Sequence, residues 1–166
     1  MKESVVDPDQ SDPFSAGLEN PSWFRPVRVW SKGMKYFQTT YRVIYGDVDA
    51  MKVAYYGNYL RWFEIGRTEL IRHLGLPYAE IEAQGFLLPV TEAYCKYGKS
   101  ARYDDVLFIN TGINFVRKAS MRFDYRILNQ ENDLLVQGYT VHACLDKTGK
   151  LVRLPEILFR VLEHWT

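Results

Sequence analysis

The stretch Tyr45-Gly-Asp-Val-Asp-Ala-Met-Lys-Val-Ala-Tyr-Tyr-Gly-Asn-Tyr59 joins the end of a predicted strand to the start of a predicted helix, Leu60-Arg-Trp-Phe-Glu-Ile-Gly-Arg-Thr-Glu-Leu-Ile-Arg-His-Leu74. Two carboxylates, Asp47 and Asp49, therefore lie within about ten residues of the backbone N–H groups that a helix start leaves without partners. Active sites combine acidic side chains with such free donors. This stretch is the candidate for function, and the elements around it decide the fold.

The helix is predicted to run from about Tyr59 to Leu74. Its apolar residues recur at three- and four-residue spacing, at Leu60, Phe63, Leu70, Ile71 and Leu74. Asn58 is the predicted N-cap, and Gly75 is expected to end the helix at the usual C-terminal glycine position. Further apolar residues widen the stripe, and Gly66 lets a neighbouring backbone come close. We therefore expect the rest of the chain to enclose this helix.

Period-two alternation of apolar and polar residues predicts the strands. The expected strands cover residues 36–45, 86–97, 107–115, 121–127 and 135–145, with a short one at 151–154. Pro89 places the start of 86–97 at an edge or a bulge, and helices are expected at 77–84 and from Pro155 onwards. Short turns between the later strands favour an antiparallel meander. The pattern predicts an α+β fold in which the sheet curls around the long helix.

The length of 166 residues suits one domain, which we expect at 34–166. Residues 1–33 carry four prolines and no periodicity, which indicates a tail. Its aromatic residues Trp23, Phe24 and Trp30 suggest docking on the domain surface, and a second explanation is that translation begins at Met34. The sequence predicts one domain with an N-terminal extension.

The composition excludes several classes of function. With 47% hydrophobic residues, 25% charged residues and a net charge of +1, nothing predicts binding to nucleic acid or to a membrane surface. Neither a transmembrane run nor a signal peptide is recognisable, which favours the cytoplasm. Cys95 and Cys144 lack metal-site spacing, so we expect two reduced thiols and no metal. The expected partner is a small molecule or a second copy of the chain.

The opening motif, Tyr45-Gly-Asp-Val-Asp-Ala-x-x-Val-x-Tyr-Tyr-x-Asn-Tyr, resembles the signature loop of hotdog-fold acyl-CoA thioesterases. It is most similar to the branch of 4-hydroxybenzoyl-CoA thioesterases and Tol-Pal-associated acyl-CoA thioesterases. Ala101-Arg-Tyr-Asp-Asp-Val-Leu107, and Arg117-Lys118 followed by Ser120, also resemble that branch. The resemblance covers about residues 36–154 and implies a curved antiparallel sheet of five to six strands wrapped around one long helix.

The resemblance implies that Asp49 is the catalytic carboxylate, acting as nucleophile or as general base on water. It also implies that the backbone N–H of Tyr56 binds the developing oxyanion. Without the resemblance, the favoured interpretation of Asp49 is a loop residue that accepts turn N–H groups. For Asp47, turn stabilisation is the favoured interpretation.

Other residues have two interpretations each. Glu64 is the alternative catalytic carboxylate, because some hotdog thioesterases use one on the helix, but an ion pair with Arg61 or Arg67 is favoured. Tyr55, Tyr56 and Tyr59 either line the acyl pocket, where Asn58 also belongs by resemblance, or are part of the core.

Cations and histidines complete the candidates. By resemblance, Arg117, Lys118 and Ser120 bind coenzyme A phosphates, and the alternative is a solvated basic turn. Some relatives place His where this chain has Tyr56. The three histidines, His73, His142 and His164, lie outside the motif and are interpreted as helix-end, strand and tail residues.

Lys52 departs from the family, which usually has glycine at this position, so the tight loop has to form without that residue's freedom at positive φ. Its ammonium group can pair with Asp49, which would lower the pKa of that carboxyl, or reach a phosphate. It can also mark a site that no longer binds the usual substrate.

The expected function is hydrolysis of an acyl-CoA thioester without a cofactor other than the coenzyme A of the substrate. The resemblance implies a homodimer or a homotetramer, because hotdog domains build their sites between subunits. Two alternatives remain: a thioesterase that acts on an acyl carrier protein, and a non-catalytic acyl-CoA binding domain. A hydratase is disfavoured, because the motif contains no histidine.

Overall fold

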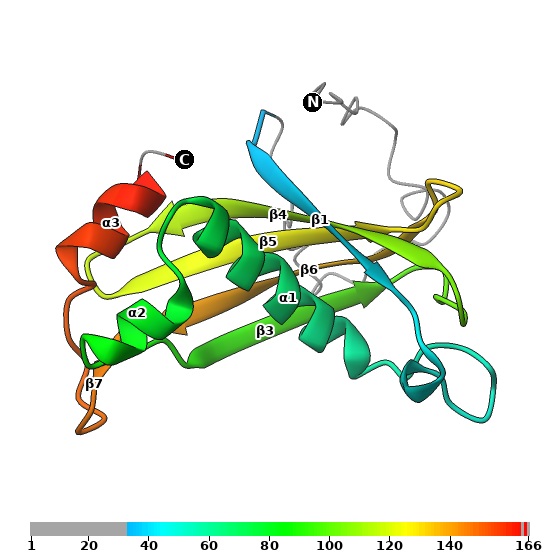
Figure 1. Cartoon of the computed structure of the whole chain (residues 1–166), viewed down its shortest axis with the longest axis horizontal. Coiled ribbons are helices and arrows are strands. Elements are labelled where there is room, and N and C mark those ends of the chain that lie inside the picture. The colour runs from blue at the N-terminus through cyan, green and yellow to red at the C-terminus, as the bar shows by residue number, and fades with distance from the viewer. Residues whose placement is uncertain (1–32, 164, 166) are drawn as a thin grey trace, which may run out of the picture.

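The structure is a computed structural model that describes residues 33–163 and Trp165. A five-stranded antiparallel sheet, in the order β1-β4-β5-β6-β3, carries the helix α1 across one face (Figure 1). The elements along the chain are β1 (Tyr36–Arg42), the 3-10 turn Tyr45–Asp47, α1 (Asn58–His73), α2 (Tyr78–Ala83), β2 (Phe86–Leu87), β3 (Val90–Tyr97), β4 (Val106–Val116), β5 (Ser120–Leu128), β6 (Leu134–Ala143), β7 (Leu145–Asp146) and α3 (Glu156–Glu163). The predicted α+β fold, with the sheet wrapped around one long helix, is confirmed.

The sheet is a meander with one strand added at each side. Strands β4, β5 and β6 follow one another through short turns, as predicted. Strand β1 pairs with β4, and β3 pairs with β6, so these two form the edges. The outer edge of β3 pairs with no strand of the described residues. The loop that carries the opening motif follows edge strand β1 and leads into α1.

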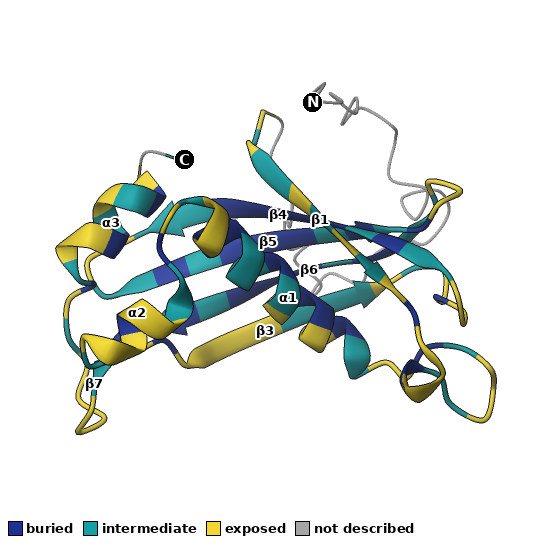
Figure 2. Ribbon diagram, in the orientation of Figure 1, coloured by how far each residue is buried: buried dark blue, intermediate teal, exposed yellow. Residues whose placement is uncertain are grey.

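Helix α1 lies on the sheet through its fully buried face. Buried stretches run along α1 in the ribbon coloured by burial (Figure 2). Trp62, Phe63 and Leu70 are buried, and the ring of Phe63 stacks on Tyr125 of β5 at 4.2 Å. At Gly66 a Cβ atom would lie 2.3 Å from the Thr111 hydroxyl oxygen. Glycine is therefore needed, although side chains of β4 make the approach and not a neighbouring backbone as predicted.

Several predicted boundaries are corrected. The first strand ends at Arg42 and not at residue 45, because the chain turns into the 3-10 segment. The expected strand 86–97 is interrupted at Pro89, where proline cannot donate to the ladder, and becomes β2 and β3. Residues 151–154 form one bridge through Leu151. Gly75 adopts a φ of +86° after the helix, as predicted.

Some expectations concern other parts of the chain. The proposed docking of Trp23, Phe24 and Trp30, the start at Met34 and the tail residue His164 involve residues 1–32 and 164, which lie outside the described residues. Cys95 and Cys144 are both free thiols, as expected. Among the described residues, no helix has the length and apolar character needed to cross a membrane.

Candidate active site

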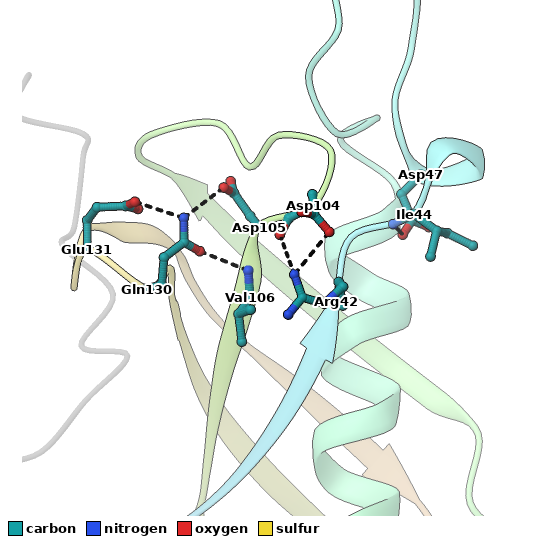
Figure 3. Close-up of polar contacts among 8 residues, drawn as sticks. All are labelled: Arg42, Ile44, Asp47, Asp104, Asp105, Val106, Gln130 and Glu131. Atoms are coloured by element: carbon teal, nitrogen blue, oxygen red, sulfur yellow. Dashed lines mark hydrogen bonds and ion pairs between the residues drawn. The ribbon is translucent and has the colours of Figure 1, made fainter.

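Asp47 ties the loop to the two elements beside it. Its carboxylate is 1% exposed, accepts a hydrogen bond from the Tyr41 hydroxyl at 2.9 Å and forms an ion pair with Arg61 of α1. It also accepts the Ile44 N–H at 3.0 Å (Figure 3). A buried carboxylate needs such partners, because desolvation of an unpaired charge is costly. These contacts agree with the prediction that Asp47 stabilises the turn.

Asn58 does not cap the helix as predicted. Gly57 occupies the N-cap position, and no side chain caps this end. The Asn58 amide instead donates to the main-chain carbonyl of Asp47 at 2.8 Å, next to the Tyr55 N–H, which donates to the same oxygen at 2.9 Å. Asn58 therefore fixes the loop to the first turn of α1 and restrains the helix start on its loop side.

Asp49 lies two residues after Asp47 in a different environment. It is half-buried, and one carboxylate oxygen, Oδ1, accepts the Met51 N–H at 2.8 Å. Its main-chain N–H donates to Val53 at 2.9 Å and its carbonyl accepts from Lys52 at 2.9 Å, which closes a tight loop. Within the described part of the chain, Oδ2 of Asp49 has no hydrogen-bond partner. The side chain is held by one oxygen and presents the other.

Lys52 adopts the left-handed conformation, with a φ of +61°. The loop therefore keeps the geometry for which a glycine is suited, at the cost of placing a side chain where L-residues are disfavoured. The Lys52 side chain is exposed and forms no ion pair with Asp49 or with any other described residue. The pairing considered from the sequence is thus not formed.

The start of α1 supplies free donors close to this loop. The Tyr56 and Gly57 N–H groups have no hydrogen-bond partner among residues 33–163. The carbonyl of Tyr56 accepts the Tyr97 hydroxyl at 3.2 Å and the Tyr59 N–H at 3.4 Å. An N-terminal turn with unoccupied N–H groups stabilises negative charge, such as that of an oxyanion. The predicted donor Tyr56 is thus free to act.

The three motif tyrosines separate into two groups. Tyr59 is 3% exposed, and its hydroxyl accepts the Ala101 N–H at 3.0 Å, so it belongs to the core and not to an open pocket. Tyr55 and Tyr56 are 48% and 63% exposed, with ring centroids 4.5 Å apart. For these two the core interpretation is wrong, and their rings are accessible beside the free N–H groups.

The block from Ala101 to Leu107 supports the motif loop, a role that the sequence reasoning missed. Ala54 donates to Ala101 at 2.9 Å, and Val43 both donates to Asp105 and accepts from Asp104. Arg42 forms an exposed ion pair with Asp104 at 3.0 Å (Figure 3).

The side chain of Gln130, in the β5–β6 turn, forms hydrogen bonds with the same block. Its side-chain oxygen accepts the Val106 N–H at 2.8 Å, and its amide donates to Asp105 at 3.1 Å (Figure 3). Two features of the sequence could have identified the block: it follows the strand expected at 86–97, and it contains the adjacent acids Asp104 and Asp105.

Arg117, Lys118 and Ser120 lie at the other end of the sheet. They form the β4–β5 turn, closed by the Arg117 N–H that donates to the Ser120 carbonyl at 2.8 Å. Strand β4 separates this turn from the loop, and its 11 residues span about 35 Å at the usual rise of a strand (Figure 1). Arg117 and Lys118 are exposed, and one chain does not bring them together with Asp49.

Glu64 does not form the predicted ion pair. Arg61 is taken by the buried Asp47 carboxylate, and no ion pair joins Glu64 to Arg67 or to another described residue. Glu64 instead borders a cavity of about 190 Å³ between α1, α2 and the sheet. The other lining residues are Arg67, Thr68, Ile71, Tyr78, Leu88, Phe123 and His142.

His142 forms the inner wall of this cavity and is 1% exposed. Its Nδ1 lies 3.0 Å from the Leu88 carbonyl, which only accepts, so Nδ1 carries the proton. Nε2 then accepts from the Thr140 hydroxyl at 2.9 Å, and Thr140 accepts from Tyr125 at 2.7 Å. Burial lowers the pKa of His142 to about 4, so the ring is neutral near pH 7. The sequence placed His142 in a strand correctly but did not connect it with the cavity.

Comparison with known proteins decides the family. The model of the thioesterase-like superfamily matches residues 43–162. The chain belongs to the thioesterase-like superfamily. The family and the hotdog fold inferred from the three sequence blocks are therefore confirmed.

Individual members of the superfamily are similar over most of their length. The acyl-CoA thioester hydrolase YbgC of Escherichia coli is 36% identical over 110 residues, which are 66% of this chain and 82% of that protein. The acyl-CoA thioesterase YbgC of Haemophilus influenzae is 34% identical, over 77% of this chain and 95% of that protein. The DHNA-CoA thioesterase structure from Staphylococcus aureus superposes with a TM-score of 0.70 at 33% identity, over 78% and 85% of the two chains.

We expect Asp47→Asn to destabilise this superfamily member by about 2 kcal/mol, because it removes the charge that Arg61 pairs with and leaves buried hydrogen bonds weakened. Chemical denaturation measures the free energy of unfolding. Asp104→Asn is the matched control: its ion pair with Arg42 is exposed, so its loss should be below about 0.5 kcal/mol. Equal losses for the two variants would contradict the assigned role of Asp47.

His142 makes the stability depend on pH. Its pKa is lowered from 6.5 to about 4 in the folded chain, so the unfolded chain takes up a proton first as the pH falls. The contribution is present above pH 6.5 and is lost as the pH falls towards 4, by at most about 3 kcal/mol. We expect His142→Gln to lose less stability than the wild type over this range in urea unfolding. Parallel curves for the two proteins would refute the neutral buried histidine.

Proposed function

We propose that the chain is an acyl-CoA thioesterase in which Asp49 promotes hydrolysis and the Tyr56 N–H stabilises the oxyanion. The observation that carries this proposal is that one tight loop and one helix start present a half-buried carboxylate and backbone N–H groups. Among residues 33–163, one oxygen of that carboxylate and these N–H groups have no hydrogen-bond partner. The names of similar proteins, YbgC among them, support acyl-CoA as the substrate class.

The chemistry follows from these two groups. A thioester carbonyl becomes negatively charged when a nucleophile adds to its carbon, and N–H groups already pointing at that oxygen lower the barrier. Asp49 either attacks the carbon itself or removes a proton from the attacking water. When Asp49 acts as a base, the oxygen of water forms the new C–O bond as the C–S bond breaks. When Asp49 attacks, the acyl group is first joined to it as an anhydride, which water then cleaves to regenerate the carboxylate. In both routes coenzyme A leaves as a thiolate that takes up a proton, and the acyl group leaves as a free acid. Both roles of Asp49 use the same free oxygen.

The full substrate site requires a second chain in this proposal. Coenzyme A bound by Arg117 and Lys118 cannot reach Asp49 of the same chain, because β4 separates them by about 35 Å. Within the described part of the chain, strand β3 has an outer edge that no other strand pairs with. Antiparallel pairing of two β3 edges about a two-fold axis reverses one sheet relative to the other, which brings the β4–β5 turn of one copy towards the motif loop of its partner. We therefore propose a homodimer with shared sites.

A specific observation keeps Glu64 as the second candidate carboxylate. It forms no ion pair within the described residues and borders the cavity of about 190 Å³, whose other walls are mainly apolar. A cavity of about 150 Å³ holds one benzene ring, so this one suits a small acyl group. The thioesterase function is the same with either carboxylate, and the two assignments differ in which variant stops turnover.

The other two functions considered from the sequence receive less support. A non-catalytic binding domain was suggested by Lys52, but the loop closes around Asp49 with Lys52 exposed and unpaired. A thioesterase for an acyl carrier protein shares the proposed chemistry, and comparing hydrolysis of matched acyl-CoA and acyl-carrier substrates separates the two.

We expect Asp49→Asn to lower kcat between about a hundredfold and ten-thousandfold while the fold and the affinity for an acyl-CoA remain. Glu64→Gln is the matched variant, for which we expect turnover within about threefold of the wild type. Release of free thiol with a panel of aliphatic and aromatic acyl-CoA esters measures both. Normal turnover in Asp49→Asn together with a collapse in Glu64→Gln would transfer the catalytic role to Glu64.

Mixed dimers test the shared site. We expect Asp49→Asn and the double variant Arg117→Ala, Lys118→Ala each to be impaired, and a re-equilibrated mixture to recover about a quarter of wild-type activity, because half of the dimers contain one intact site. The control is each variant refolded alone. A mixture no more active than the mean of its components would show that Asp49 and the basic turn do not act across chains.

A further inference from the structure

Tyr97 connects the edge strand of the sheet to the start of helix α1. It is the last residue of β3, and its hydroxyl donates to the main-chain carbonyl of Tyr56, a residue 41 positions earlier, at 3.2 Å. Among the described residues, the only other hydrogen bond to that carbonyl is the longer one from the Tyr59 N–H, at 3.4 Å. A side chain from the sheet therefore holds the turn that opens the helix.

The Tyr97 side chain is 44% exposed, and packing of its ring holds it in place. Its ring packs edge-on against Tyr59 at 5.3 Å, and Tyr59 is buried and bonded to Ala101. Burial, reinforced by Cys95, raises the pKa of Tyr97 to about 12, so the hydroxyl keeps its proton and remains a donor at neutral pH. The hydrogen bond from the Tyr97 hydroxyl to the Tyr56 carbonyl therefore keeps its donor at neutral pH.

The helix start has few other restraints on this peptide. The N-cap residue Gly57 offers no side chain, and no side chain caps the N-terminus. The Asn58 N–H donates to the Tyr55 carbonyl at 2.9 Å, which joins the peptide groups on either side of the Tyr56–Gly57 peptide but not that peptide itself. Among the described side chains, only Tyr97 fixes its carbonyl.

The orientation of this peptide decides where the free donors point. The Gly57 N–H lies in the same peptide plane as the Tyr56 carbonyl and points in the opposite direction. The Tyr56 N–H lies in the preceding peptide, which the backbone torsions of Tyr56 connect to that plane. Accepting a hydrogen bond at the carbonyl also polarises the peptide and strengthens its donor end. Displacement of catalytic groups by about 1 Å can cost about a hundredfold in rate.

We propose that Tyr97 is a positioning residue for hydrolysis: its hydroxyl orients the Tyr56–Gly57 peptide so that the N–H groups at the helix start face the thioester oxygen. This inference rests on the proposed thioesterase function. It assigns to β3, whose outer edge pairs with no strand of residues 33–163, a direct connection to the oxyanion donors.

The test compares Tyr97→Phe, which removes only the hydroxyl, with Tyr97→Leu, which also removes the ring. For Tyr97→Phe we expect kcat to fall about tenfold, KM to stay within about twofold and the melting temperature to be unchanged, because the donors bind the transition state more than the substrate. Tyr94→Phe is the matched control on the same strand; its ring stacks on Tyr139 on the opposite face, and it should retain wild-type kcat. A normal kcat in Tyr97→Phe overturns the proposal, even if Tyr97→Leu is impaired, because the ring would then act by packing alone.

A second measurement does not depend on turnover. Amide exchange followed by NMR should be faster at Asn58 and Tyr59, whose N–H groups donate to the Tyr55 and Tyr56 carbonyls, in Tyr97→Phe than in the wild type or in Tyr94→Phe, because the turn loses its carbonyl restraint. If the wild type hydrolyses no acyl-CoA ester, the proposed function fails, and the exchange rates alone decide the link: unchanged exchange at both amides would show that Tyr97 does not hold this turn.

Discussion

The buried carboxylate of Asp47 is the constraint on which the motif loop depends. Its charge lies inside the protein, so it has to be paired, and its partners come from the end of β1, from the loop and from α1. The carbonyl of the same residue receives two further donors, from Tyr55 and Asn58. The angle at which the chain leaves the sheet and enters the helix is therefore decided by the need to satisfy one residue.

The hydrogen bonds and the ion pair of the Asp47 carboxylate give it a different chemical environment from that of Asp49. Only Val48 separates Asp47 from Asp49 in the sequence, yet the carboxylate of Asp47 is surrounded by donors. The carboxylate of Asp49 keeps one oxygen without a partner among the described residues, beside a tight turn. A group committed to three strong contacts is poorly placed to attack a substrate or to accept a proton, since either step would break the network. The same loop thereby holds one acid as a structural anchor and leaves the other available for chemistry. The left-handed Lys52 belongs to this arrangement, because the turn that exposes Asp49 closes through its N–H.

Most of the fold could be predicted because it is recorded in local patterns. The helix and the meander follow from periodicity, and Gly75 from its place after the last apolar residue. The partner of Arg61 could not be predicted, since helical spacing offers Glu64, and only the tertiary fold brings in a buried carboxylate that binds the guanidinium more strongly.

The candidate site was predictable where the motif is contiguous and not where it depends on distant strands. Asp49 and Tyr56 were proposed from one stretch of sequence, and their roles stay predictions. Tyr97 was not, because its contact spans 41 positions and its strand looked like any other. The length of β4 keeps Arg117 away from Asp49 within one chain, so their grouping stays a prediction that needs a second chain.

Strand β3 combines two of these requirements. An unpaired edge leaves backbone donors and acceptors without partners, which invites association with another strand. In the proposed dimer, pairing of this edge satisfies those groups, and it does so on the strand whose last residue holds the oxyanion turn. The same pairing brings the basic turn of the second copy towards Asp49. Completion of the sheet and completion of the site would then be one step, because the strand that binds the partner also orients the donors.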